Sequence, residues 1–484
     1  MLINFTSRNA EILLGSNYID KEYRNSFLSS NLQKNYYSIQ VQTLRFFDRQ
    51  RSDVNGLVES FRGSARYMYD IFTKSFAYGQ YGALDAQSFT YDGSIAILSY
   101  LVSGQIRKAR QMLDVYSHEF YHLKNGNMGL LNCYATDRPS NGGLAMGIDS
   151  RIHLGPNMWV TIAGLQYTAI TGDLTYLDFL IDEMKWAQSL EHYVFPDGRR
   201  GGVSMGFGWG ADWSKVFSTE NNVDYYAALI MMKEIYEKGG DKVRHIFKAN
   251  DYGPKDMISE IVGLRRWLKQ VIYDKENEYL TVGFNEHGVD RVAALDTVSW
   301  TIAALGPKTL KKMGIDPFKL MDFAERNFLV TDEISGVKVS GFDFTNTESR
   351  GRDLKMMWME GTGFHIVAYQ VMSDYADELG LYDLAKKYRK KAKIFSDELQ
   401  YASVLVNFKD GALPYTSKKP KEKEIILTFK DEWEIPRGNK GQWVASSSST
   451  GWRFLSLAAF NPLSFNHKTV YYKLFASSDT ARLR

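Results

Sequence analysis

The chain has 484 residues, enough for two to four ordinary domains or one large closed architecture with a substantial core. Its 59 Lys and Arg nearly balance its 56 Asp and Glu, for a formal net charge of +3, so no strong overall field selects nucleic acid or an anionic membrane as a partner. The sequence contains no run of 18 apolar residues, which argues against a transmembrane helix, and its single cysteine, Cys133, excludes an internal disulfide.

The first residues, "MLINFTSRNAEILLGS", lack a basic segment followed by a sustained apolar run, so we expect no signal peptide. The compartment is left open: periplasmic or extracellular if a signal peptide has been removed, and cytoplasmic otherwise. We expect a single domain with a core at about 56–463, an N-terminal extension at 1–55 and a C-terminal tail at 464–484.

Hydrophobic periodicity predicts that most of the chain is helical. Six segments are apolar on most of their circumference, as buried helices must be: 93–104, 158–172, 224–240, 297–306, 363–380 and 451–460. Each follows a more amphipathic segment, and these lie at 61–76, 105–120, 173–190, 257–272, 317–329 and 382–400. The alternation predicts an inner ring of buried helices inside an outer ring of half-exposed ones.

The openings of the apolar helices recur at a regular spacing. Taken in order, the residues at these openings are Asp92, Pro156, Glu220, Asp296, Glu360 and Ser449, and three of the five steps are 64 residues long. Such a period exceeds that of common open solenoids, so the repeat favours a closed toroid of six helical hairpins.

The longest loops before the openings, 195–222 and 339–363, are rich in glycine and aromatic residues. Long loops in a compact chain tend to be functional, and we expect short β-hairpins within them. The charged segment 418–438 is interpreted as a surface insertion, and the basic run 385–395 as the solvated face of an outer helix.

The openings "TYDGSIAILSYLVSG", "GPNMWVTIAGLQYTAITG", "STENNVDYYAAL", "ALDTVSWTIAALG" and "WMEGTGFHIVAYQ" resemble those of bacterial six-hairpin glycosidase-like (α/α)6 toroids, and "SSSSTGWRFLSLAAFNPL" is similar to the last inner helix of such proteins. The resemblance covers roughly 56–463. It implies an all-α fold and a carbohydrate-active protein whose cleft lies at the N-terminal ends of the inner helices, commonly hydrolysing glycosidic bonds with inversion. It assigns no glycoside hydrolase family.

Glycoside hydrolysis needs one protonated and one ionised carboxyl group. Asp92, Glu220, Asp296 and Glu360 all lie at inner-helix openings, although acids at helix N-termini also serve as caps that complement the helix dipole. We take Glu220 and Glu360 as the first candidates for the acid and base pair, with Asp92 and Asp296 as alternative bases. Which residue is the acid stays open, but Glu360 has the more apolar neighbours.

Aromatic residues make up 14% of the chain, an amount that suits both a core and stacking against sugar rings. We interpret Trp159, Trp186 and Trp267 as core, and expect Tyr134 to line the cleft. The predicted substrate-binding residues are Tyr91, Asp149, Arg151, Trp209, Asp212, Trp213 and Trp358, of which Trp209, Trp213 and Trp358 are candidate stacking platforms.

Two signals for other chemistry are weaker. His118 and His122 lie in an H-E-x-x-H pattern typical of zinc peptidases, but no third ligand follows and the segment ends a peripheral helix, so we predict no metal and no cofactor. His365 suits an epimerase or lyase, or a buried core histidine. The leading hypothesis is an inverting glycosidase acting on an oligosaccharide or polysaccharide; the alternatives are a non-catalytic glycan-binding or assembly protein, and an epimerase or lyase.

Overall fold

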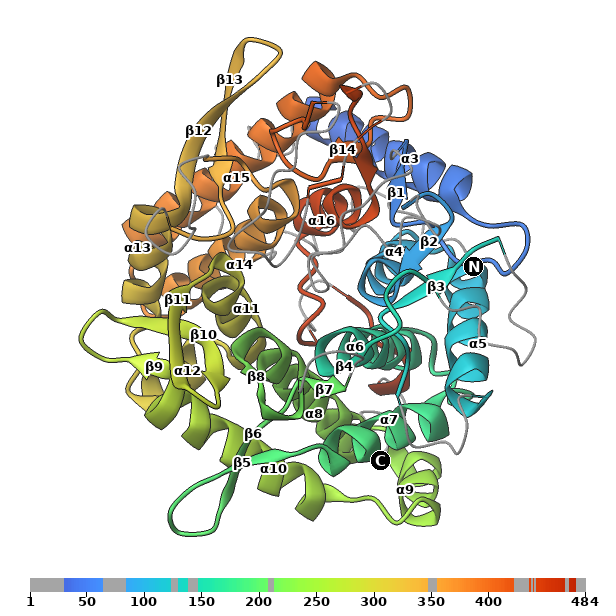
Figure 1. The fold of residues 1–484 in the computed structure, drawn as a ribbon, viewed down its shortest axis with the longest axis vertical. Coiled ribbons are helices and arrows are strands. Elements are labelled where there is room, and N and C mark those ends of the chain that lie inside the picture. Colours follow the sequence, from blue (N-terminus) through green and yellow to red (C-terminus); the bar gives the residue numbers. More distant parts are fainter. Residues whose placement is uncertain are drawn as a thin grey trace.

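The computed structural model describes residues 30–63, 84–122, 129–137, 147–207, 213–346, 355–421, 435–436, 438, 441–465 and 470–475, leaving out the side chains of 30–36 and 122. Within these ranges six helices surround a common axis (Figure 1). These inner helices are α4 (Thr90–Val102), α6 (Leu154–Thr171), α8 (Thr219–Lys238), α11 (Leu295–Leu305), α14 (Met359–Glu378) and α16 (Ser447–Leu457). Each packs against the next, and α16 packs against α4, so the ring is closed.

The outer ring has one helix before each inner helix in the chain (Figure 1). In the described part of the chain these are α3 (Ser30–Gln50), α5 (Ile106–His122), α7 (Leu177–Ser189), α10 (Pro254–Trp267), α13 (Pro317–Phe328) and α15 (Tyr382–Val406). The predicted all-α fold, an (α/α)6 toroid of six hairpins, is therefore confirmed. Its physical cause is burial, because the inner helices are apolar around most of their circumference and have neighbours on every side.

The inner helices begin a few residues earlier than the hydrophobic pattern predicts. Helix α14 begins at Met359 instead of residue 363, and α8 at Thr219 instead of residue 224. The first turn of each of these helices is polar, so the apolar pattern begins only after the helix has started. Their ends lie close to the glycines that the sequence indicates, and Gly172 terminates α6 with a left-handed φ of 72°.

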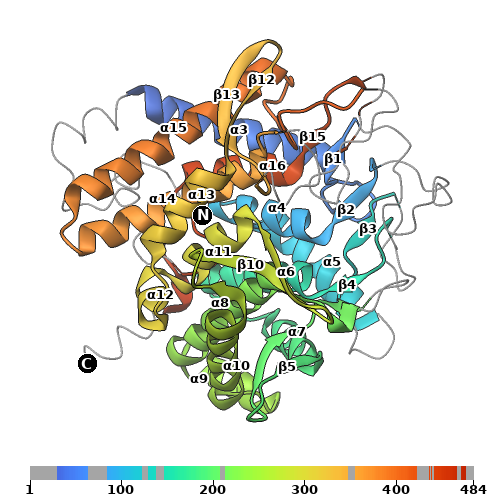
Figure 2. The same cartoon turned by 60° about the vertical axis from the view of Figure 1, so that its left-hand side comes forward.

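Short antiparallel pairings link the openings of the inner helices, as predicted for the loops. Among the described residues β2 (Gln87–Phe89) pairs with β3 (Cys133–Ala135), β4 (Ile152–His153) with β7 (Gly206–Phe207), and β8 (Phe217–Ser218) with β10 (Tyr279–Asn285). Single bridges join Ala294 to Thr345 and Trp358 to Thr416, and β15 (Ala445–Ser446) pairs with both β1 (Phe61–Arg62) and β14 (Leu413–Pro414). Apart from β14 with β15, which both lie between α15 and α16, each pairing joins the loop before one inner helix to the loop before the next, so the pairings form a ring of their own. In Figure 2, β1, β2, β3 and β4 lie on one side of the molecule and the turn between α14 and α15 lies on the other.

The remaining described elements lie outside this ring. They are the hairpins β5 (His192–Val194) with β6 (Arg200–Val203), β10 with β11 (Gly288–Ala293), and β12 (Leu329–Ile334) with β13 (Val337–Phe342); the strand β9 (Tyr273–Asp274); the helices α9 (Gly240–Ala249) and α12 (Pro307–Met313); and the short turns η1 (Trp213–Lys215) and η2 (Leu268–Ile272).

The first hairpin differs from the prediction. A helix was expected at 61–76, but Phe61 and Arg62 form strand β1, and residues 64–76 lie outside the described residues. The outer helix that precedes α4 is α3, which comes from the segment assigned to the N-terminal extension. Phe46 and Phe47 of α3 are fully buried, and α3 packs against α16 and α4.

A polar side chain in the first turn ties four inner helices to a neighbouring loop. Asn157, Asn222, Thr362 and Thr450 each donate to the carbonyl four residues earlier, and each also bonds the backbone of a neighbouring segment. The neighbouring atoms are those of Leu130, Val203, Phe342 and Leu413. These bonds satisfy buried backbone groups and hold the openings at equivalent heights.

Candidate active site

The second residue of each inner helix occupies an equivalent place at the opening of the toroid. Counted from the observed helix starts, these residues are Tyr91, Gly155, Glu220, Asp296, Glu360 and Ser448. The sequence analysis, which compared the six openings of this chain with one another, assigned Asp92, Pro156 and Ser449 to this second position, one residue too late in each case. The correction brings a tyrosine into line with the three acids, because the observed helix starts and not the apolar pattern set the register.

Glu360 lies at the centre of a hydrogen-bonded chain. The Tyr91 hydroxyl donates to Glu360 Oε1 at 2.5 Å, and the Trp452 indole N–H donates to the Tyr91 oxygen at 2.7 Å. Burial raises the pKa of Glu360 to about 8, and the nearby Asp92 carboxylate adds to the rise, while the bonds from Tyr91 and Ser448 oppose it. Glu360 is therefore protonated at neutral pH.

Asp92 lies beside Glu360 and is also buried. Burial raises its pKa to about 6, and hydrogen bonds from Ser60 and Ser448 limit the rise. Ser448 thus connects two acids that come from helices α4 and α14. Because the two carboxyl groups repel when both are ionised, the proton of Glu360 is retained more strongly.

Three further acids lie on the facing side of the opening. Glu220 and Asp296 are partly exposed, and removal from water raises the pKa of Asp296 to about 7. Asp224, one helical turn below Glu220, is fully buried, and its pKa is raised well above the usual range by burial and by the charges of Glu220 and Asp296. The sequence analysis did not single out Asp224, because it placed the start of the apolar helix at that residue, whereas α8 begins at Thr219 and Asp224 lies in its second turn.

Tyr415 is a tyrosine on which the charges of several of these acids act. Burial raises its pKa well above the usual range, and the charges of Glu360, Asp92, Glu220 and Asp296 all contribute. The charges of four carboxyl groups from four inner helices therefore act on one hydroxyl. That these acids converge on one cleft stays a prediction, and Tyr415, in the loop after α15, was not predicted.

Aromatic rings form the base beneath the acids. One turn after each second position come Ile95, Trp159, Asp224, Trp300, Phe364 and Trp452. Trp159 contacts Trp300 and Trp452 with ring centroids 5.2 and 5.8 Å apart, and Phe364 contacts Trp300 and Trp452 at 5.3 and 5.8 Å. Trp159 is buried, as predicted, but within the base of the opening and not in a peripheral part of the core.

Tyr91 spans this base. Its ring contacts Trp159 on α6 at 5.2 Å and Trp300 on α11 at 6.1 Å, while its hydroxyl bonds Glu360 on α14. Tyr91 was predicted to bind substrate, and the structure places its hydroxyl against a candidate catalytic acid.

A second polar group lies beside the opening of α6. Arg151 donates to Asp149 through Nε at 2.7 Å and through Nη2 at 2.6 Å, and its guanidinium lies 5.6 Å from the Trp213 ring centroid. His153, which precedes α6, packs against Trp213 with ring centroids 4.9 Å apart. Three of the predicted binding residues are therefore neighbours, whereas Trp209 and Asp212 lie outside the described residues.

Trp358 does not offer a ring face to a sugar in this structure. It is 6% exposed, it stacks on Phe344 with centroids 4.0 Å apart, and Gly361 packs so closely that an added Cβ would lie 2.3 Å from Trp358 Cε3. We therefore reassign Trp358 from stacking platform to core. Tyr134, expected in the cleft, is also fully buried, and its hydroxyl accepts from the Leu131 N–H.

The histidine signals lie away from the acids. No group of three or more His, Cys, Asp or Glu side chains in the described residues is arranged to hold a metal ion, and the side chain of His122 is not described. His365 is buried against Phe342, its Nδ1 is bonded to Ser299 Oγ at 2.7 Å, and burial lowers its pKa to about 3. In the described part of the chain, no helix is long and apolar enough to cross a membrane.

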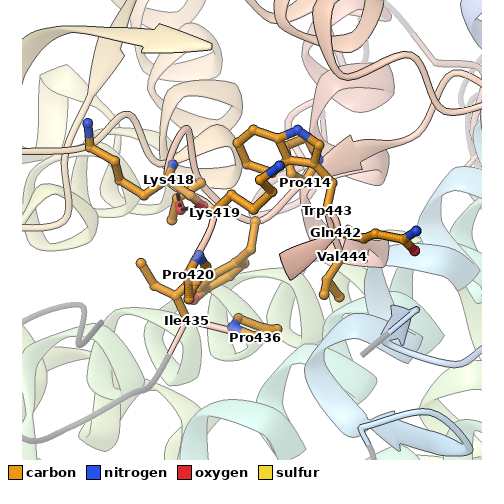
Figure 3. A pocket seen from close by; sticks show the side chains of 11 residues that line it. Pro414, Lys418, Lys419, Pro420, Ile435, Pro436, Gln442, Trp443 and Val444 are labelled. Carbon is orange, nitrogen blue, oxygen red and sulfur yellow. Dashed lines mark hydrogen bonds between the residues drawn. The ribbon is translucent and has the colours of Figure 1, made fainter. Parts of the chain in front are cut away.

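The surface of the described residues has two hollows. The first lies beside Tyr415 and is lined by the segments 414–420, 435–436 and 442–444; Figure 3 shows Lys419 beside the Trp443 ring, with Nζ 5.7 Å from the centroid. The second is a groove of about 370 Å³, lined in part by His192, Phe217 and Phe284. Phe217 belongs to β8, directly before the helix that carries Glu220, and none of the candidate acids lines this groove.

Solved structures with a similar fold cover nearly the whole chain. A cellobiose 2-epimerase from Bacillus thermoamylovorans is 12% identical with a TM-score of 0.52, and the match covers 88% of this chain and 99% of that chain. A family 76 glycoside hydrolase from a bovine Bacteroides thetaiotaomicron strain is 10% identical with a TM-score of 0.53, covering 89% and 78%. A glycosidase with a glutamate-to-alanine substitution, in complex with glucose, is 10% identical with a TM-score of 0.52, covering 89% and 99%.

No protein-family model and no curated protein sequence matches the chain. The likeness to solved structures is one of fold, and the shared fold is the (α/α)6 toroid.

Proposed function

We propose that the protein is a carbohydrate-active enzyme that hydrolyses a glycosidic bond, with Glu360 as the general acid. The observation that carries the proposal is the pair Tyr91 and Glu360 within a ring of acids: a buried carboxyl group with a pKa of about 8, held by a tyrosine at 2.5 Å. A general acid must be protonated at working pH and able to give its proton to the leaving oxygen. Solved structures of this fold include a glycoside hydrolase and a glycosidase bound to glucose, which supports a sugar substrate.

Glu220 is the proposed base. It occupies the same second position as Glu360 on a helix two places away in the ring, and it is partly exposed, so water can reach it. Glu220 would take a proton from that water as the water attacks the anomeric carbon, while Glu360 protonates the departing oxygen. This is the inverting reaction, and Asp296 is the alternative base.

A groove of about 370 Å³ near the start of α8 would suit an oligosaccharide or polysaccharide substrate better than a single sugar. Phe217 and Phe284 would offer apolar contact to a sugar chain held there, and the carboxylates of Glu191 and Glu286 would accept hydrogen bonds from its hydroxyls.

The test measures reducing-end release from a panel of bacterial and plant glycans by the native protein and by Glu360→Gln, Glu220→Gln and Glu183→Gln. Glu183 is the matched control, since it is a fully buried carboxyl group on the outer helix α7. We expect release by the native protein and the control, and a loss of about 10²–10⁴-fold in kcat for the other two with binding retained. The anomer formed first, followed by NMR, reports inversion.

Other outcomes separate the alternatives. Binding of a glycan without release would indicate a glycan-binding or assembly protein. A product absorbing in the near ultraviolet would indicate a lyase, and solvent deuterium incorporated at a sugar carbon would indicate an epimerase. Full activity in Glu360→Gln would refute the assignment of the acid.

A further inference from the structure

The turn between α14 and α15 exposes three large apolar side chains within four residues. Leu379, Leu381 and Tyr382 are 50%, 43% and 62% exposed. The turn is held in place by its backbone, because the Leu379 N–H donates to the Tyr375 carbonyl and the Leu381 N–H to the Ala376 carbonyl. A single exposed apolar residue needs no explanation, but three on one turn form a patch that indicates a contact with another surface.

A run of basic residues follows this turn on α15. Residues 386–393 contain six Lys or Arg and no acid. Three of the six pair with the carboxylates of Asp377, Glu325 and Asp397. The other three, Lys386, Lys387 and Lys390, are exposed and form no ion pair within the described residues. Tyr388 and Phe395 of the same helix are buried, so these lysines lie on the face of α15 that is directed away from the core.

Helix α12 brings further lysines to the other side of the turn. Lys308 pairs with Glu378, the last residue of α14, at 2.9 Å, and this pair places α12 beside the turn. Lys312, also on α12, is exposed and has no acidic partner in the part of the chain that the structure describes. Asp383 lies in the turn and Asp374 one helical turn earlier, so the four lysines without an acidic partner outnumber the two further acids. In Figure 2, α12 and the turn lie on the same side of the molecule, away from β1 to β4.

An apolar tip flanked by lysines matches the surface of an anionic bilayer. Apolar side chains enter the boundary between the headgroups and the acyl chains, and lysines reach the anionic headgroups while their stems pack on apolar surface. A soluble polyanion would use the lysines but would leave Leu379 and Leu381 in water. The formal net charge of the whole chain is only +3, so the attraction comes from this local group of lysines and not from the overall field.

We propose that the turn between α14 and α15 docks the protein on an anionic membrane surface. Leu379, Leu381 and Tyr382 enter the headgroup region, and the lysines of α12 and α15 contact the lipid headgroups. Glu360 lies at the opposite end of α14, about 30 Å away at 1.5 Å per residue. The docked protein therefore keeps the opening of the toroid toward water, where a glycan can enter. Docking is independent of the proposed function, because lipid binding needs no catalysis.

The experiment is flotation of the full chain with vesicles of phosphatidylcholine alone and of phosphatidylcholine with one third phosphatidylglycerol, at low and high salt. We expect binding only to the anionic vesicles, and weaker binding at high salt. Lys386→Gln combined with Lys390→Gln should weaken binding about 10-fold or more. Lys275→Gln combined with Lys338→Gln is the matched control, since both lysines are exposed in the loops before α11 and α14, and it should bind as the native protein does.

A second pair of variants tests the apolar contact. Leu379→Ser combined with Leu381→Ser keeps every lysine and should still weaken binding about 10-fold, because less apolar surface leaves water. Leu329→Ser changes a leucine that is 47% exposed on β12 and should have no effect. Urea unfolding of each variant verifies that the fold is retained.

The proposal is overturned by an absence of binding to anionic vesicles, by equal binding to neutral vesicles, or by unchanged binding in either double variant. Unchanged binding in the leucine variant alone would assign the lysines to a soluble polyanion. A native dimer that the leucine variant abolishes, seen by sedimentation velocity without vesicle binding, would assign the patch to a second copy of the chain. Glycan hydrolysis is measured separately, so either proposal can fail while the other stands.

Discussion

Two residues 269 positions apart in the chain define the candidate acid. Tyr91 donates to Glu360 and accepts from Trp452, so the tyrosine couples three inner helices through one hydroxyl. A hydroxyl that donates to a carboxyl group favours its ionised form, so Tyr91 keeps the pKa of Glu360 lower than burial alone would.

Tyr91→Phe tests this coupling. Without the hydroxyl, the pKa of Glu360 should rise, and the alkaline limb of the kcat/KM profile, expected near pH 8, should move to higher pH. The Trp452 N–H loses its acceptor, so the free energy of unfolding should fall by about 1–3 kcal/mol. A pH profile that is unchanged in shape would contradict the role of Tyr91, whatever the loss of stability.

Glu360 also makes stability depend on pH. Its pKa is about 8 in the folded protein against 4.5 for the free side chain, so the folded state holds a proton that the unfolded state releases between these values. The stabilisation from that proton is complete below pH 4.5 and is lost as pH rises toward about 8, on the order of a few kcal/mol.

Glu360→Gln removes this dependence. Urea unfolding of the two proteins should give similar free energies near pH 4.5, with the variant more stable near pH 8. A variant that is less stable at pH 8 than the native protein would contradict the raised pKa.

At the scale of the element, the inner helices share one local design. The second residue faces the opening, the residue one turn later forms its base, and a nearby Asn or Thr bonds the adjoining loop. Glycine has a packing role in this design. In the stretch "WMEGTGFH", Gly361 lies against the Trp358 ring, and a Cβ on Gly363 would lie 2.8 Å from the Trp452 side chain.

Gly361→Ala should therefore be unfavourable. The added Cβ would meet Trp358 Cε3 at 2.3 Å and Leu295 Cδ2 at 3.0 Å, and Trp358 cannot retreat because Phe344 stacks on it. We expect a loss of about 1–3 kcal/mol in unfolding free energy and reduced turnover, because Glu360 is the adjacent residue. Gly253→Ala is the control, since nothing lies within 4 Å of its Cβ position, and it should change stability little.

At the scale of the whole molecule, different segments connect the inner helices at the two ends of the ring. Short strand pairings link the openings, whereas residues 458–465 run beneath the inner helices after α16. There Asn461 donates to the Ala303 carbonyl near the end of α11, and Gln166 of α6 donates to the Pro462 carbonyl. Phe460 and Leu463 are buried in this segment, so residues 458–465 join helices from both halves of the ring.

Asn461→Ala should weaken this closure. The Ala303 carbonyl is near the end of α11, where carbonyl groups need partners outside the helix. We therefore expect the free energy of unfolding, measured by urea unfolding, to fall by about 1–3 kcal/mol. Asn327→Ala, which removes a bond within the outer helix α13, should cost less. Equal losses in the two variants would show that the segment contributes no closure.

The sequence alone determined the six inner helices and five of the six outer helices, while the first outer helix, expected at 61–76, is formed by Ser30–Gln50. Apolar periodicity is a local property, because a helix buried on all sides must be apolar on all sides, and the pattern therefore survives in the one-dimensional chain. It was less accurate at the polar first turns, which explains why Asp92, Pro156 and Ser449 were each placed one residue late.

Only the tertiary structure decided which side chains meet. The pairing of Tyr91 with Glu360, the charges of four acids that act on Tyr415 and the full burial of Asp224 depend on ring closure between helices far apart in sequence. The raised pKa values also belong to this level, because burial and neighbouring charge come from packing and not from residue type. The sequence thus determined that acids gather at one end of a toroid, and the fold decided which of them holds a proton at neutral pH.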